Sequence, residues 1–269
     1  MTLPEGVHST RRPADEAESR RANRRDWDAY ADEYQATHGP FLRDVGFVWG
    51  PEGVDEDQVG ALGDVRGRRI LEIGCGAAQC ARWLMSRGAT AVGIDLAERQ
   101  LQHARRIDDA TGLRVPVVGG TATHLPFADD SFDGAFSSFG ALQFVADIEQ
   151  AVAEVARVLR LEGRFAFSIT HPIRWSMPDD PTREGLVVTS SYWDRTPYVE
   201  EDDAGLVRYV EHHRTIGDWV GVLSRAGFVL RGLLEPEWPE GHDRIWGGWG
   251  PERGRLIPGT AIFVADWRP

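Results

Sequence analysis

The stretch that decides the fold runs from Arg69 to Gly76 and reads RILEIGCG. It begins as an apolar run that is typical of a buried strand. Gly74 and Gly76 then allow a tight turn and a close approach of the backbone to a ligand. A helical pattern starts at Gln79, and the N–H groups at the beginning of a helix favour an anionic ligand group. The stretch therefore predicts a strand, a ligand-binding turn and a helix.

Strand and helix patterns alternate after this turn. Strands are predicted at residues 69–73, 89–94, 114–118, 133–137 and 164–169, and helices at 79–87, 98–110 and 147–160. This rhythm implies a parallel sheet with right-handed crossovers. A further helix is predicted at 216–226, followed by two last strands at 228–234 and 260–267.

The length of 269 residues fits a single domain with additions. We expect a flexible tail at residues 1–22, which are polar and contain two prolines. A helix should then begin near Trp27 and break at Gly39-Pro40, and a second short helix should cover 55–62. The single domain is expected to comprise an N-terminal helical segment (23–66), a cofactor-binding core (67–170), a cap (171–213) and the C-terminal part of the core (214–269).

The composition excludes several classes of function. All 30 basic residues are arginine, which excludes a Schiff-base lysine and a phosphate loop that needs lysine. The two cysteines are too few for a disulfide framework, and no spacing matches a metal motif, so we expect no metal. A net charge of -12 argues against binding to nucleic acid. No apolar run approaches the ~20 residues of a membrane span, and no secretory signal is visible. We expect a cytoplasmic protein that is a monomer or a homodimer and has no membrane partner.

The next strand ends in Asp95, a carboxylate placed to accept hydrogen bonds from both hydroxyls of a ribose or to cap the following helix. Two cofactors fit a glycine turn followed by such a carboxylate: a dinucleotide and S-adenosylmethionine. The third glycine of a dinucleotide fingerprint would fall at Gln79, which disfavours a nicotinamide oxidoreductase. Glu72, just before the turn, favours S-adenosylmethionine.

Four ordered motifs support that second cofactor: EIGCG at 72–76, VGIDL at 92–96, HLPFADDSFD at 124–133 and VLRLEGR at 158–164. Together they resemble the class I S-adenosylmethionine-dependent methyltransferases, in the small-molecule, type 11-like branch. The resemblance implies an α/β, Rossmann-like fold with a mostly parallel seven-stranded sheet and helices on both faces. It also implies N-terminal helices, a cap inserted after the fifth strand, and S-adenosyl-L-methionine as cofactor.

The resemblance assigns cofactor-binding residues as well. The glycine turn would pass under the methionine part, Asp95 would hold the ribose, and Leu96 would lie beside the adenine. Thr121 stands where the family usually has an acidic residue. The expected cofactor-binding residues are Tyr34, Glu72, Gly74, Cys75, Gly76, Asp95, Leu96, Thr121, Ala122, Thr123, Ser138 and Phe139.

The acceptor side is predicted from the C-terminal edge of the sheet. His171 follows the fifth strand there, so it is a candidate base, or else it fixes the turn at Pro172. The substrate pocket is expected to contain Tyr30, Gln143, His171, Trp175, His212, His213 and Trp238. We predict transfer of a methyl group, by in-line displacement, to a small aromatic or apolar acceptor. The alternative is a non-catalytic protein that binds S-adenosylmethionine or S-adenosylhomocysteine as a sensor or partner.

Overall fold

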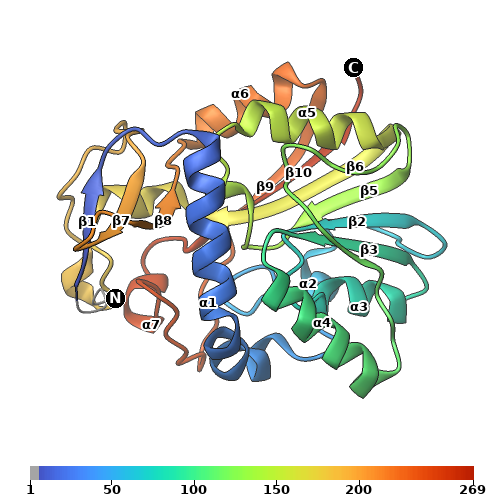
Figure 1. The fold of residues 1–269 in the computed structure, drawn as a ribbon, viewed down its shortest axis with the longest axis horizontal. Coiled ribbons are helices and arrows are strands. Elements are labelled where there is room, and N and C mark those ends of the chain that lie inside the picture. The colour runs from blue at the N-terminus through green and yellow to red at the C-terminus, as the bar shows by residue number, and fades with distance from the viewer. Residues whose placement is uncertain (1–5) are drawn as a thin grey trace.

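A computed structural model describes residues 6–269, which form two β-sheets and the helices around them (Figure 1). The elements in chain order are β1 (Val7–Arg11), α1 (Glu16–Leu42), α2 (Glu56–Val59), β2 (Arg69–Ile73), α3 (Gln79–Ser86), β3 (Thr90–Asp95), α4 (Glu98–Thr111), β4 (Val117–Gly119), β5 (Phe132–Ser137), η1 (Leu142–Phe144), α5 (Ile148–Val158), β6 (Leu159–Thr170), η2 (Pro172–Ser176), η3 (Arg183–Gly185), β7 (Tyr198–Asp202), β8 (Val207–Glu211), α6 (Ile216–Arg225), β9 (Phe228–Leu234), α7 (Pro251–Gly254) and β10 (Thr260–Trp267).

The larger sheet has seven strands in the order β4-β3-β2-β5-β6-β10-β9. The first five run parallel to one another, while β10 is antiparallel to both β6 and β9. Figure 1 shows α5 and α6 on one face of this sheet, and α2, α3 and α4 on the other. The predicted mostly parallel seven-stranded sheet with helices on both faces is therefore confirmed.

Two hydrophobic clusters fill the space between the sheet and these two helix layers. Phe132, Val155 and Phe167 belong to the cluster on the side of α5 and α6. Ile70 and Phe136 belong to the cluster on the opposite face. Parallel strands buried on both faces read as nearly continuous apolar runs, which explains why they were visible in the sequence.

The N-terminus differs from the prediction. A flexible tail over residues 1–22 is wrong for the described part, because β1 pairs antiparallel with β7 and α1 already begins at Glu16. The Asp15 side chain caps α1 by accepting a hydrogen bond from the Glu18 N–H. Residues 1–5 of the predicted tail lie outside the described residues. The sequence of β1 is polar, and its pairing partner β7 lies far along the chain, so its strand structure could not be predicted locally.

The predicted break at Gly39-Pro40 is also wrong, since α1 runs for 27 residues through Pro40 to Leu42. Pro40 lies in the last turn, where its missing N–H costs a single hydrogen bond. The N–H of Arg43 then bonds to the carbonyl of Gly39 at 2.8 Å and ends the helix. The short helix expected at 55–62 is present as α2, with a capping box between Asp55 and Gln58.

The segment 171–213, expected as a cap, leaves the large sheet after β6 and supplies β7 and β8. These two strands and β1 form the smaller sheet, which packs against α1. The smaller sheet is thus built from two chain segments that are distant in sequence. Across residues 6–269, no helix combines the length and the apolarity needed to cross a lipid bilayer.

Candidate functional site

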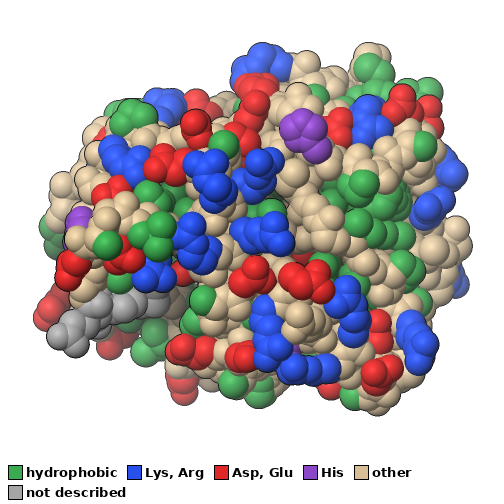
Figure 2. All heavy atoms as spheres, viewed as in Figure 1, with side chains coloured by type: hydrophobic (Ala, Val, Ile, Leu, Met, Phe, Trp, Pro, Cys, Tyr) green, Lys and Arg blue, Asp and Glu red, His purple; other side chains and the backbone are tan. Residues whose placement is uncertain are grey.

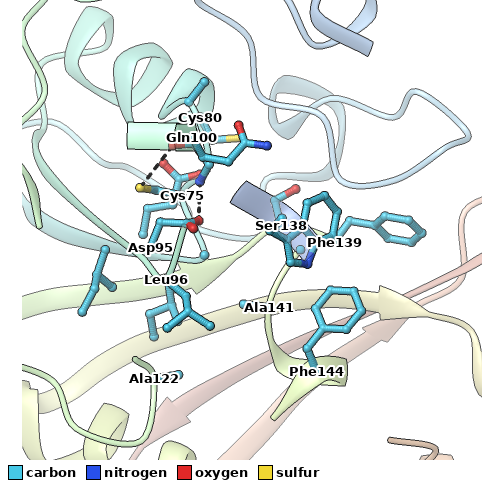
Figure 3. A pocket seen from close by; sticks show the side chains of 18 of the residues that line it. Cys75, Cys80, Asp95, Leu96, Gln100, Ala122, Ser138, Phe139, Ala141 and Phe144 are labelled. Atoms are coloured by element: carbon cyan, nitrogen blue, oxygen red, sulfur yellow. Dashed lines mark hydrogen bonds between the residues drawn. The ribbon is translucent and has the colours of Figure 1, made fainter. Parts of the chain in front are cut away.

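A cavity of about 160 Å³ opens at the C-terminal ends of β2, β3 and β5, and part of its wall is α1. Figure 3 shows its interior, with Asp95 and Leu96 on one side and Ser138, Phe139 and Phe144 on the other. Ligands of open parallel sheets bind at this edge, beyond the carboxyl ends of the strands. The wall combines small residues of the turn after β2 with aromatic side chains from α1 and from later loops.

The glycine turn after β2 requires glycine for two different reasons. Gly74 has φ +70, and a Cβ there would lie 2.4 Å from the Cβ of Ala141, so the turn packs tightly against the loop after β5. Gly76 has φ +52, but the nearest atom to a Cβ there would be Gln100 Oε1 at 3.9 Å. The backbone at Gly76 is therefore open to close approach by a ligand.

Asp95 connects the end of β3 to this turn. Its Oδ2 accepts a hydrogen bond from the N–H of Gly76 at 2.7 Å, and its Oδ1 accepts one from the N–H of Ala97 at 2.8 Å. Burial raises the pKa of the Asp95 carboxyl above its ordinary value. A carboxylate has about four acceptor positions, so these two bonds leave capacity for the hydroxyls of a ribose.

Glu72 lies at the floor of the cavity on β2 and is buried. Its Oε2 accepts a hydrogen bond from the N–H of Ala81 at 2.9 Å, which ties β2 to the first turns of α3. Burial raises the pKa of the Glu72 carboxyl to about 8. At neutral pH this carboxyl therefore carries its proton for most of the time.

The loops after β4 and β5 complete the cofactor side of the cavity. Ser138 Oγ donates a hydrogen bond to the carbonyl of Val48 at 2.6 Å, so this hydroxyl anchors the loop. Phe139 has φ +53, a rare conformation for a residue with a side chain, and its N–H bonds to Ser168 Oγ at 2.8 Å. Of the residues predicted to bind the cofactor, all except Thr123 line the cavity.

Aromatic side chains from α1 and from the loop before β10 form another part of the wall. The rings of Trp27 and Tyr34, both on α1, meet edge to face with centroids 5.5 Å apart. Trp246 stacks on His38 of α1 at 4.2 Å, and Arg244 donates a hydrogen bond to His38 Nδ1 at 2.7 Å. Burial lowers the pKa of His38 to about 4, so its ring is neutral near pH 7. These contacts attach the loop around Trp246 to α1.

None of the residues predicted for the acceptor pocket lines this cavity. His171 Nδ1 accepts a hydrogen bond from the N–H of Ile173 at 3.2 Å, and its Nε2 lies 2.8 Å from Glu235 Oε1. Burial lowers the pKa of the His171 ring. Both nitrogens thus have partners, and His171 caps η2, which is the turn-fixing role left open by the sequence.

The other predicted acceptor residues lie elsewhere. Gln143, Trp175 and His212 border a separate cavity of about 10 Å³, roughly the space of one water molecule. His213 Nε2 bonds to the carbonyl of Tyr192 at 2.7 Å. Trp238 Nε1 donates a hydrogen bond to the carbonyl of His242 at 2.7 Å. The ring of Tyr30 makes a tilted contact with that of Trp27.

The cavity wall includes residues that the sequence prediction missed. Glu16 and Arg20 line the cavity from the segment that was expected to be a tail, and Asn23 lines it from the first residue of the expected helical segment. Their spacing, continued by Trp27 and Tyr34, places them on one face of a helix. The helical spacing is present in the sequence, but its first members are polar, so it does not form the apolar stripe by which a helix is usually predicted. The loop residues Phe144 and Val145 gave no comparable pattern.

Comparisons with known proteins agree with this geometry. Residues 71–167 match the family model described as a methyltransferase domain. The chain is 39% identical over 105 residues to methyltransferase GfsG of Streptomyces halstedii, covering 38% of this chain and 37% of that protein. It is 36% identical over 107 residues to demethylmenaquinone methyltransferase of Thermobifida fusca, covering 39% of this chain and 45% of that protein.

The matched stretch thus spans less than half the length of either curated relative. Among solved structures, an S-adenosylmethionine-dependent methyltransferase from Mesorhizobium loti superimposes with a TM-score of 0.61 at 27% identity, covering 81% of this chain and all of that one. The Rossmann-like fold expected from the sequence is therefore confirmed. The glycine turn, Asp95 and these similarities lead to one conclusion: residues 71–167 match a methyltransferase domain, and the fold around them is that of an S-adenosylmethionine-dependent methyltransferase.

Proposed function

We propose that the protein transfers a methyl group from S-adenosyl-L-methionine to a small, largely apolar or aromatic acceptor. One observation carries this proposal: the glycine turn and Asp95 open into a cavity that continues along the aromatic wall of α1. A protein that only binds the cofactor needs no space beyond it. The names of the relatives, which include a demethylmenaquinone methyltransferase, support a small-molecule acceptor.

The residues present fit the cofactor. The open backbone at Gly76 would face the methionine part, and the spare acceptor capacity of Asp95 would hold the ribose hydroxyls. Leu96 and Ala122 would flank the adenine as apolar walls. When bound, S-adenosyl-L-methionine supplies a methyl group attached to a positively charged sulfur.

The chain's contribution to the reaction is to bind, to orient and to exclude water. Aromatic faces of the α1 wall stabilise a positive charge in the cavity. Tyr34 keeps its phenolic proton at neutral pH, and burial raises its pKa further above the ordinary value. His171 lies outside the cavity wall, so we assign it no proton transfer.

Calorimetric titration of the purified protein with S-adenosylmethionine, S-adenosylhomocysteine and NAD tests the cofactor assignment. We expect binding of the two adenosyl compounds and none of NAD. Tight binding of NAD, or binding of none of the three, would contradict the proposal.

A second experiment separates the enzyme from a non-catalytic binder. The protein is incubated with S-adenosylmethionine and a panel of aromatic and apolar small molecules, and S-adenosylhomocysteine is measured as the product. Formation that depends on one acceptor supports the enzyme. Binding of both adenosyl compounds without turnover across the panel would favour the sensor or partner.

A further inference from the structure

One cation in the cavity wall has no partner. Arg20 lines the cavity from α1 and is exposed, and within residues 6–269 it makes no hydrogen bond, ion pair or ring contact. It is also the single Arg or Lys among the described residues that line this cavity. An arginine at the wall of a binding cavity offers a planar fork of donors that matches a carboxylate or a similar anion.

The acidic residues of the same wall, in contrast, are already satisfied. Glu16 lies one turn before Arg20 on the same helix face, a spacing that normally allows an ion pair. Its Oε2 instead accepts hydrogen bonds from the N–H groups of Ala146 and Asp147, at 3.0 and 3.1 Å. Glu72 and Asp95 likewise accept hydrogen bonds from backbone N–H groups. The carboxylates of the wall therefore leave Arg20 available for a ligand.

The surroundings of Arg20 are positive although the whole chain carries a net charge of -12. Four exposed arginines follow one another on this part of α1: Arg20, Arg21, Arg24 and Arg25. Figure 2 shows basic side chains gathered on the face where the N-terminal half of α1 lies. Such a local concentration of positive charge attracts an anionic ligand to the cavity.

The position of Arg20 separates it from the methionine end of the cofactor site. Gln35, near the other end of the lining face of α1, bonds to Gln79 and Gln100 beside the glycine turn, at 3.0 and 2.9 Å. Arg20 lies 15 residues earlier on α1, which is about 22 Å along a helix. Between the two lies Trp27, whose ring meets that of Phe144 edge to face at 5.8 Å.

We propose that the acceptor consists of an apolar or aromatic body with an anionic group, and that Arg20 binds this group while Trp27 and Phe144 contact the body. The inference rests on the proposed function, because it names the class of acceptor for the same cavity. Arg20 is a specificity-determining residue in this assignment. The anion is a carboxylate or a group of the same charge and shape, such as a sulfonate.

Two fluorescent dyes with the same ring skeleton test the proposal. Anilinonaphthalene sulfonate carries an anionic group, and phenylnaphthylamine is its neutral counterpart. Each dye is titrated into the full chain saturated with S-adenosylhomocysteine, as wild type, Arg20→Gln and Arg21→Gln. Arg21 is the matched control, since it is an exposed neighbour on α1 that does not line the cavity.

We expect Arg20→Gln to weaken the binding of the sulfonate dye about tenfold, the scale of a lost hydrogen bond between charged groups. Its affinity for the neutral dye should not change, and Arg21→Gln should change neither. Arg20→Lys keeps the charge and should restore part of the lost affinity. Equal loss for both dyes, or no loss for either, would overturn the inference, because Arg20 would then act through packing or be merely solvated.

Calorimetry with S-adenosylhomocysteine on the same variants distinguishes this inference from the proposed function. Unchanged affinity in Arg20→Gln supports a role on the acceptor side, and a parallel loss would reassign Arg20 to the cofactor and overturn the inference. If wild type binds no S-adenosylhomocysteine, the proposed function fails. The dye titrations, repeated without S-adenosylhomocysteine, then still decide whether Arg20 selects an anionic ligand.

Discussion

Asp95 both positions the glycine turn and faces the space assigned to the ribose, so its removal should have a measurable effect on ligand binding. We predict that Asp95→Ala weakens the binding of S-adenosylhomocysteine by about 1–3 kcal/mol, the range for a lost charged hydrogen bond. Calorimetry provides the measurement. Asp109→Ala, which removes an exposed acid of α4, should leave the affinity unchanged. Equal affinities of wild type and Asp95→Ala would remove Asp95 from the ribose site.

Gly76 and Gly60 have similar backbone angles, so comparing the same substitution at both distinguishes an effect of backbone strain from a loss of the ligand site. Gly76 has φ +52 in the cavity, and Gly60 has φ +63 at the end of α2 with no atom within 4 Å of its would-be Cβ. Valine at either position costs about 1–2 kcal/mol of strain. We predict that Gly76→Val abolishes binding of S-adenosylhomocysteine and that Gly60→Val retains it, as measured by calorimetry. Normal binding by Gly76→Val would contradict the assigned turn.

Glu72 makes the stability of the protein depend on pH. Burial raises its pKa from 4.5 to about 8, so the folded chain holds this proton more tightly than the unfolded chain. Its contribution to the unfolding free energy is therefore full below pH 4.5 and is lost as the pH rises towards 8. Glu72→Gln should remove this contribution, with a difference in slope of at most about 1.4 kcal/mol per pH unit. Urea unfolding at several pH values checks this, and identical slopes would contradict it.

At the scale of single residues, all but one of the residues predicted for the cofactor line the cavity, whereas none of those predicted for the acceptor does. Gly76, Asp95 and Ser138 lie within a few residues of a strand end, so the strand pattern places them at the cavity. The placement of Arg20 depends instead on a helix whose position is set by distant contacts. His171 follows a strand in the same way as Ser138, but its ring bonds to Glu235 and the N–H of Ile173 outside the cavity wall.

At the scale of elements, the buried side chain of Asn23 ties α1 to β8. Asn23 Nδ2 donates a hydrogen bond to the carbonyl of Val210 at 2.9 Å, and its Oδ1 accepts one from the N–H of the same residue at 2.9 Å. We predict that Asn23→Ala lowers the unfolding free energy by about 1–3 kcal/mol, because it leaves buried backbone groups of β8 unpaired. Urea unfolding measures the change. Glu33→Ala, on the exposed side of α1, is the control, and an equal effect of both variants would contradict a specific role for Asn23.

Most strands of the large sheet were predicted with nearly correct limits because they carry their own apolar pattern. The exceptions are β4, which begins three residues later than predicted, and β6, which begins five residues earlier. β9 and β10 begin and end at the predicted residues. β1 was missed because its burial pattern shows no fully buried residue, and its order comes from pairing with β7. Pro40 misled the prediction of α1, since a proline in the last turn of a helix costs little.

At the scale of the whole molecule, ligand binding should affect the two sheets differently. S-adenosylhomocysteine at about 100 times its Kd should raise the unfolding free energy by about 2.7 kcal/mol. Hydrogen exchange should slow in the glycine turn and along the lining face of α1, and stay unchanged in β7, whose residues do not line the cavity. Uniform slowing across both sheets would contradict a ligand site confined to the large one. Thermal unfolding and mass spectrometry provide the two measurements.

The overall architecture could be predicted because four motifs occur in order along the large sheet. The smaller sheet could not be predicted, because it joins residues 7–11 to residues 198–202 and neither segment shows by itself where it pairs. Local patterns determine elements, whereas such distant pairings depend on the complete chain.

The pairing of β1 with β7 also has a consequence for synthesis on the ribosome. Val7 leaves the ribosome early, but its partner Asp202 follows only after most of the chain has been made. The nascent chain can therefore assemble β2 to β6 before α1 finds its support on β8. The ligand cavity receives its final wall late in translation, so a cofactor added to stalled nascent chains should be retained only once β8 has emerged.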